Sequence, residues 1–155
     1  SAASDVYKRQ VAITLENCYD DWCMSILAKE LNKEEDYQYY LKRALNYQNV
    51  FDTATGFMRP KTADGRWIEP FDPIWSGGQG RREFYTENNG WNYTWYVPHD
   101  VEGLIGLMGG REKFTDKLQT MFETNVPLYQ KYDFLKQYPD MTGWIGMYSH
   151  GNEIT

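Results

Sequence analysis

A glutamate followed closely by asparagines and aromatic residues is the stretch of the sequence best suited to chemistry. Glu87 opens the run ENNGWNYTW, so Trp91, Tyr93 and Trp95 follow it at short intervals. A carboxyl group among such rings would be partly desolvated, which favours its protonated form at neutral pH. The rings offer a platform for a sugar, and asparagine side chains both donate hydrogen bonds to hydroxyls and accept them. A protonated carboxyl in this setting suits a general acid that cleaves a glycosidic bond. The local pattern alone fits an exposed loop glutamate beside core tryptophans better than it fits a catalytic acid.

Two other groups of polar residues have structural and functional interpretations. Asp100 follows a Val-Pro-His turn, where an aspartate typically caps the first turn of a helix. His150 and Glu153 are three residues apart, a spacing that puts both on one helix face and is compatible with a metal ion or a polyol. Two ligands do not make a zinc site, and His99 is the only other histidine in the chain.

Charge and composition exclude several classes of function. The net charge is −6, and no basic run is longer than two residues, so the chain lacks the positive surface that nucleic acids and anionic membranes require. No apolar run approaches the roughly 18 residues needed to span a bilayer, and the N-terminus has no signal-peptide pattern. Cys18 and Cys23 lie five positions apart on one predicted helix, which makes a mutual disulfide improbable and predicts buried or idle thiols.

Apolar periodicity predicts helices that must hold these residues in place. Leu15, Tyr19, Trp22, Ile26 and Leu27 recur at three- and four-residue intervals, which predicts an amphipathic helix over 13–31. The residues Asn32 to Glu35 have the arrangement of a capping box, with the asparagine as N-cap of a second helix over about 37–48. The two helices would form an antiparallel hairpin. We expect residues 1–10, which have no such periodicity, to be a non-native N-terminal extension.

Turn residues and a further helical pattern complete the predicted fold. Residues 57–71 predict a small β-hairpin that turns at Asp64-Gly65, and 76–80 form a glycine-rich loop. One helix would begin after Asp100 and end at Gly109-Gly110, and another would span 111–123. The prediction is an all-α domain in which helical hairpins stack around a common axis and carry function on their loops.

Two long segments and one short segment resemble one enzyme family. Residues 19–73, residues 85–110 (YTENNGWNYTWYVPHDVEGLIGLMGG) and residues 150–153 (HGNE) are similar to the calcium-dependent exo-α-mannosidases of glycoside hydrolase family 92. The resemblance implies an (α/α)6 barrel, of which residues 11–155 would be an incomplete catalytic domain. It also implies inverting hydrolysis of terminal α-mannose in mannoproteins or N-glycans, a calcium cofactor, and a periplasmic or secreted location.

The resemblance also assigns roles to individual residues. Glu87 matches the acid of the family's E-x-N-x-W-x-Y motif. Asn88, Gly90 and Asn92, which lie between the motif residues, differ from the residues usual in the family. Ile154 and Thr155 differ from the residues that usually follow HGNE. Some members of the family have glutamine in place of this acid and act on mannosyl phosphates. The presence of Glu87 therefore indicates ordinary mannosides as substrates. The substrate-binding residues implied in this way are Asn89, Trp91, Tyr93, His150, Asn152 and Glu153.

The general base and the rest of the pocket would lie on a missing remainder of the chain, so the fragment alone should be inactive. We expect Glu87 and the 150–153 segment to face one cavity. Two alternatives stay open at this point: a noncatalytic carbohydrate-binding helical module, and an (α/α)6 glycoside hydrolase that acts on a different sugar.

Overall fold

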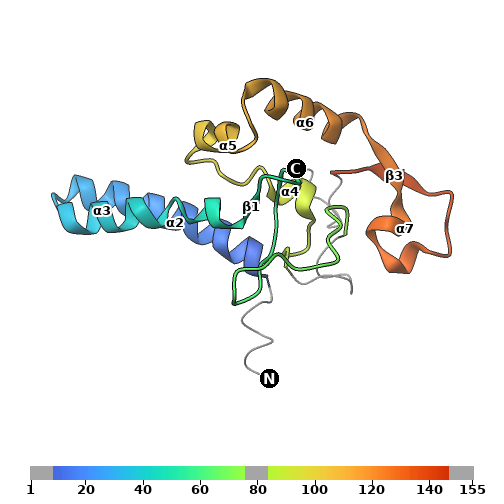
Figure 1. Cartoon of the computed structure of the whole chain (residues 1–155), viewed down its shortest axis with the longest axis horizontal. Coiled ribbons are helices and arrows are strands. Elements are labelled where there is room, and N and C mark those ends of the chain that lie inside the picture. Colours follow the sequence, from blue (N-terminus) through green and yellow to red (C-terminus); the bar gives the residue numbers. More distant parts are fainter. Residues whose placement is uncertain (1–8, 76–83, 147–155) are drawn as a thin grey trace.

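The computed structural model describes residues 9–75 and 84–146, which form helices joined by loops and two small β-hairpins (Figure 1). The elements in chain order are α2 (Gln10–Glu30), α3 (Glu34–Arg43), η1 (Asn46–Val50), β1 (Phe51–Asp52), β2 (Phe57–Met58), α4 (Gly90–Tyr93), α5 (Val101–Leu107), α6 (Arg111–Glu123), β3 (Asn125–Pro127), α7 (Leu128–Lys131), η2 (Asp133–Leu135) and β4 (Thr142–Trp144). The mainly helical class with a small hairpin is confirmed. The closed (α/α)6 barrel stays a prediction.

Helices α2 and α3 lie side by side as an antiparallel hairpin, as predicted (Figure 1). Asn32 ends α2 in the left-handed conformation, at φ 55°. The Lys33 N–H donates to the carbonyl of Ala28 and the Asn32 N–H to that of Lys29, which together make a Schellman motif. The predicted capping box is therefore wrong: Lys33 is the N-cap of α3 and makes no side-chain capping bond.

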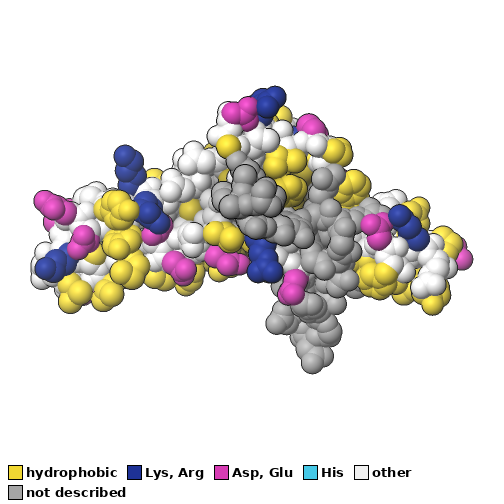
Figure 2. Space-filling view, turned by 90° about the horizontal axis from the view of Figure 1, so that it is seen from below, with side chains coloured by type: hydrophobic (Ala, Val, Ile, Leu, Met, Phe, Trp, Pro, Cys, Tyr) yellow, Lys and Arg dark blue, Asp and Glu magenta, His cyan; other side chains and the backbone are white. Residues whose placement is uncertain are grey.

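The buried face of α2 differs from the predicted one. Leu15 is buried, but Ile26 and Leu27 are exposed, and small residues including Cys18, Ser25 and Ala28 pack inward in their place. Exposed apolar side chains therefore gather at the far end of the α2–α3 hairpin (Figure 2).

The first residues of α2 are tied to the loop that follows β2. Gln10, which the sequence had placed in the N-terminal extension, begins α2. Its side-chain amide donates to the carbonyl of Lys61 at 3.0 Å, and its side-chain oxygen accepts from the Lys61 N–H at 2.7 Å. Gln10 is therefore part of the fold, whereas residues 1–8 lie outside the described residues.

A short β-hairpin and a single β-bridge follow η1. Strands β1 and β2 pair in antiparallel register, Phe51 with Met58, around a turn that the sequence did not predict. In that turn the Asp52 carboxylate accepts from the Ala54 N–H and from the Thr55 hydroxyl, each at 3.0 Å. The hairpin predicted over 57–71 is present in minimal form, as a single antiparallel bridge between Lys61 and Trp67.

Helix η1 is joined to the start of α5 by a hydrogen bond between Tyr47 and Asp100. Asp100 caps α5 by accepting from the Gly103 N–H at 3.0 Å, as predicted. Its other carboxylate oxygen accepts from the buried Tyr47 hydroxyl at 2.6 Å. A side chain at Gly103 would collide with both Tyr47 and Asp100, so this close approach requires glycine. Helix α6 has the predicted bounds.

Two apolar clusters form the core. The larger joins α2, η1, β2 and α5, and the smaller, around Met121, Val126 and Ile145, joins α6 to the β3–β4 hairpin. The two cysteines are free; burial raises the pKa of Cys18 to about 11, whereas Cys23 is exposed. Among the described residues, no helix is long and apolar enough to cross a membrane.

Candidate active site

Glu87 lies in the short segment 84–89 that leads into α4. Its backbone is in the left-handed region, at φ 54°. That conformation is uncommon for a residue other than glycine, and such residues cluster at functional sites. Its side chain is exposed, so the partial desolvation expected from the neighbouring rings is not produced by this part of the chain.

Asn89 holds the loop of Glu87 in place. It is fully buried and is the N-cap of α4, where its side-chain oxygen accepts from the Asn92 N–H at 3.1 Å. Its side-chain amide donates to the carbonyl of Ile74 at 3.3 Å and to that of Ile145 at 3.2 Å. Both ends of the side chain are thus committed to backbone groups, which gives Asn89 a structural role. Direct contact between Asn89 and a sugar stays a prediction.

A second bond ties α4 to the same distant segment. The Asn92 side-chain amide donates to the carbonyl of Gly146 at 2.7 Å. Ile145 is itself fixed because its N–H donates to the carbonyl of Thr124 at the end of α6. The loop of Glu87 is therefore joined to the end of the β3–β4 hairpin, four positions before His150.

Trp91, in α4, packs against the smaller cluster and contacts residues of β2 and α6. Its ring meets Phe57 edge-on, with the ring centroids 4.8 Å apart and an interplanar angle of 81°. The ammonium nitrogen of Lys117 lies 4.8 Å from the centroid of Trp91. The indole Nε1 of Trp91 is buried and has no hydrogen-bond partner within the described ranges.

Tyr93 lies against the segment that carries Glu87. Its hydroxyl donates to the carbonyl of Thr86 at 3.3 Å, and its ring lies 5.9 Å from that of Tyr85. Tyr85 is buried and donates its hydroxyl to the carbonyl of Met58 at 2.5 Å. The structure therefore brings Glu87, Asn89, Trp91 and Tyr93 into one loop-and-turn unit, whereas His150, Asn152 and Glu153 lie outside the described residues.

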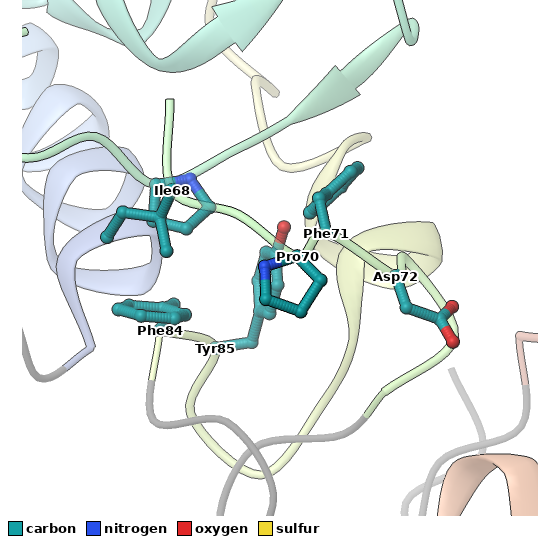
Figure 3. Close-up of a pocket in the computed structure, with 7 residues that line it drawn as sticks. Ile68, Pro70, Phe71, Asp72, Phe84 and Tyr85 are labelled. Carbon is teal, nitrogen blue, oxygen red and sulfur yellow. The ribbon is translucent and has the colours of Figure 1, made fainter. Parts of the chain in front are cut away.

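A small apolar hollow is lined in part by the start of this unit (Figure 3). Its walls come from the loop after β2 and from the two residues that open the Glu87 segment: Pro60, Ile68, Pro70, Phe71, Asp72, Phe84 and Tyr85. Asp72 is the only carboxyl group among the described residues of the wall, and its Oδ1 accepts from the Ile74 N–H at 2.9 Å. The described part of the wall thus lacks the convergent polar groups that a sugar site needs.

Sequence reasoning missed two charged residues that shape this region. Arg59 is buried, donates to the Asp52 carboxylate at 3.0 Å and also pairs with Glu69. Burial opposes ionisation of Asp52, but hydrogen bonds from Ala54, Arg59 and Thr55 outweigh it and lower the pKa of Asp52. The run of proline, glycine and aromatic residues around Arg59 signals a loop, and nothing local signals a buried ion pair. The other missed residue is Lys117.

Metal ions in proteins are typically bound by clusters of His, Cys, Asp and Glu side chains. Residues 9–75 and 84–146 contain no group of three or more His, Cys, Asp or Glu side chains placed to hold a metal ion. Calcium prefers six to eight oxygen ligands, so the described carboxylates do not fit it by themselves.

Comparisons with known proteins define the class of this domain. The model of the glycosyl hydrolase family 92 catalytic domain matches residues 1–155. A solved α-mannosidase of family 92 from Bacteroides thetaiotaomicron, in complex with mannoimidazole, is 41% identical with a TM-score of 0.73 and covers 77% of this chain. An inverting mannosidase of the same family and organism is 39% identical with a TM-score of 0.66 over 72% of the chain. The fold and the Glu87 unit are therefore part of a glycoside hydrolase catalytic domain.

The chain belongs to glycosyl hydrolase family 92. A curated relative described as an uncharacterized secreted glycosidase, from Arthroderma benhamiae, is 33% identical over 140 residues, which is 76% of this chain. The chain spans 17% of that relative, and 16% and 14% of the two bacterial structures.

Proposed function

We propose that the complete protein carrying this chain is an inverting, calcium-dependent exo-α-mannosidase that removes terminal α-mannose from mannoproteins or N-glycans outside the cytoplasm. The observation that carries the proposal is the position of Glu87. This carboxyl is exposed on a left-handed residue at the edge of a loop that the buried Asn89 anchors. The loop thus presents an acid on a fixed support. The mannosidases among the solved relatives support the choice of sugar.

Glu87 is the general acid in this proposal. Its carboxyl group donates a proton to the oxygen of the departing alcohol, while a carboxylate from another segment takes a proton from the attacking water. In an inverting enzyme the two carboxyl groups lie about 6.5–9.5 Å apart, which leaves room for that water. Bound sugar and the remaining part of the protein would cover Glu87 and favour its protonated form.

The bonds from α4 to residues 145 and 146 support a pocket shared with the 150–153 segment. His150 follows Gly146 by four residues in the sequence. We propose that His150, Asn152 and Glu153 bind hydroxyls of the same mannose, next to Trp91 and Tyr93. The helical hairpins around them would be part of an (α/α)6 barrel.

Calcium is the proposed cofactor, with oxygen ligands drawn at least in part from elsewhere in the protein. When bound at the sugar, the ion would favour the distorted ring shape that precedes cleavage. Residues 9–75 and 84–146 contain no cluster of three or more His, Cys, Asp or Glu side chains that could hold the ion.

The stereochemistry of the product tests the proposal. The full-length protein would be mixed with an aryl α-mannoside, and the anomeric proton of the released mannose followed by NMR before mutarotation. We expect β-mannose first. Initial α-mannose would contradict an inverting mechanism, and binding without release would indicate a noncatalytic carbohydrate-binding module.

A further inference from the structure

A lysine from α6 lies against aromatic rings of two other elements. The ammonium nitrogen of Lys117 is 3.3 Å from the centroid of Phe57 in β2 and 4.8 Å from the centroid of Trp91 in α4. The same nitrogen lies beside Gly56, where an added Cβ would be 3.4 Å away. A single side chain therefore spans the β1–β2 turn and the helical turn that follows Glu87.

The environment of Lys117 indicates that rings, and not an acid, hold its charge. Within residues 9–75 and 84–146 no carboxylate pairs with it, and burial lowers the pKa of Lys117 to about 8. Aromatic faces attract ammonium groups, more strongly where water is excluded. Lys113, one turn earlier on α6, is exposed and contacts no ring among the described residues.

The position of Trp91 gives this contact a consequence for the site. Helix α4 has only four residues, and Trp91 is its second residue, four positions after Glu87. Asn89 fixes the start of the turn, while Phe57 and Lys117 fix the indole that projects from it. A movement of the Trp91 ring would therefore move the turn on which the Glu87 loop is anchored.

We propose that Lys117 is a positioning residue for the active site, which holds the Trp91 indole and thereby the loop of Glu87 through its cation–π contacts. The proposal rests on the proposed function, because displacement of the Glu87 loop lowers turnover only in a glycosidase that uses Glu87. Lys117 itself does not touch the substrate.

The test compares Lys117→Met, Lys117→Arg and the control Lys113→Met in the full-length protein. We expect Lys117→Met to lower kcat on an α-mannoside roughly 3- to 30-fold, the range expected from the loss of a desolvated cation–π contact. Lys117→Arg keeps a cation over the rings and should recover most of that loss. Lys113→Met should match the wild type, and the loss from Lys117→Met should be much smaller in a Trp91→Phe background.

A spectroscopic measurement separates this proposal from the proposed function. In protein labelled with fluorotryptophan, the ¹⁹F resonance of Trp91 is assigned by its absence in Trp91→Phe. Lys117→Met should shift or broaden that resonance, whereas Lys117→Arg and Lys113→Met should leave it near its original position. An unchanged Trp91 resonance in Lys117→Met, or equal losses of kcat in the Met and Arg variants, would overturn the positioning role.

Absence of mannosidase activity in the wild type would overturn the proposed function. The ¹⁹F comparison would then still test whether Lys117 holds the Trp91 ring. If Lys117→Met does not fold, Lys117→Arg decides: a displaced Trp91 resonance in that variant contradicts the proposal.

Discussion

The side-chain amide of Asn89 donates a hydrogen bond to the backbone carbonyl of Ile145, across 56 positions of the sequence. This bond joins the loop of the proposed acid to the β3–β4 hairpin. It explains why a single buried asparagine can set the position of Glu87 relative to the segment that leads to His150.

Asn89→Ala should therefore destabilise the fold strongly. The variant loses the N-cap of α4 and leaves the carbonyls of Ile74 and Ile145 without their donor, so we expect a loss of about 2–4 kcal/mol in the free energy of unfolding. Urea unfolding followed by circular dichroism measures this loss. Asn49→Ala is the control, because Asn49 is exposed and its one side-chain bond spans a single turn. Equal stabilities of the two variants would refute the anchoring role of Asn89.

How far the sequence predicts this structure depends on whether a signal is local. Helix α6 and the capping role of Asp100 follow from periodicity and turn residues within a few positions, and both were predicted. The buried face of α2 was predicted wrongly, because small residues such as Ala28 are buried while Ile26 is left exposed. Periodicity identifies an apolar stripe but not the partner that covers it.

The same distinction applies to the site. Glu87, Trp91 and Tyr93 were found by their resemblance to a family motif, and the structure places them in one unit. The anchoring role of Asn89 was missed because its partners lie 15 and 56 positions away. Lys117 was missed for the same reason: on α6 it has the pattern of an ordinary surface lysine, and only the tertiary fold puts it over two rings.

Disruption of the buried pair between Arg59 and Asp52 should also be costly. Arg59→Met leaves the Asp52 carboxylate buried without its counter-charge, and we expect a loss of about 3–5 kcal/mol in unfolding free energy. Arg66→Met removes an exposed pair with Asp64 and should cost less than about 1 kcal/mol. Chemical denaturation of both variants at pH 7 gives the comparison, and a small effect in Arg59→Met would contradict the structural importance of the pair.

The Asp52 carboxylate should make stability depend on acid pH. Its pKa is lowered in the folded state, so between the folded and unfolded pKa values the unfolded chain binds more protons. Stability from this group is present above the unfolded value of 3.8 and is lost as the pH falls through the folded pKa. Thermal unfolding between pH 3 and pH 6 should show a shallower decline in Asp52→Asn than in the wild type. An identical decline would exclude Asp52 as a contributor.

Lys131 should make stability depend on pH in the neutral to alkaline range. It is buried, its ammonium has no hydrogen-bond partner among the described residues, and burial lowers its pKa to about 7 from 10.5. Between these two values the unfolded chain carries the extra proton, so stability rises with pH. Lys131→Met should be more stable than the wild type at pH 6, with the difference shrinking towards pH 10. The exposed Lys42→Met is the control, and a Lys131→Met variant less stable than wild type at pH 6 would show that its ammonium is paired.

Removal of calcium should abolish activity if the ion holds the sugar in its reactive shape. Full-length protein treated with a chelator is expected to release no mannose from any α-mannoside, whatever the leaving group, and to recover on addition of Ca²⁺. Activity that persists after complete removal of calcium, verified by elemental analysis, would remove the ion from the proposal.

The most direct test of the account replaces Glu87 by glutamine in the full-length protein and assays an aryl mannoside and a mannobioside. General acid catalysis commonly contributes about 10²- to 10⁴-fold, so turnover of the mannobioside should fall by that order while substrate binding is largely retained. The loss on the aryl mannoside should be much smaller, because its leaving group departs with little need for a proton. Equal losses on both substrates would show that Glu87 positions the sugar without donating the proton, and unchanged turnover of both would contradict the assignment of Glu87 altogether.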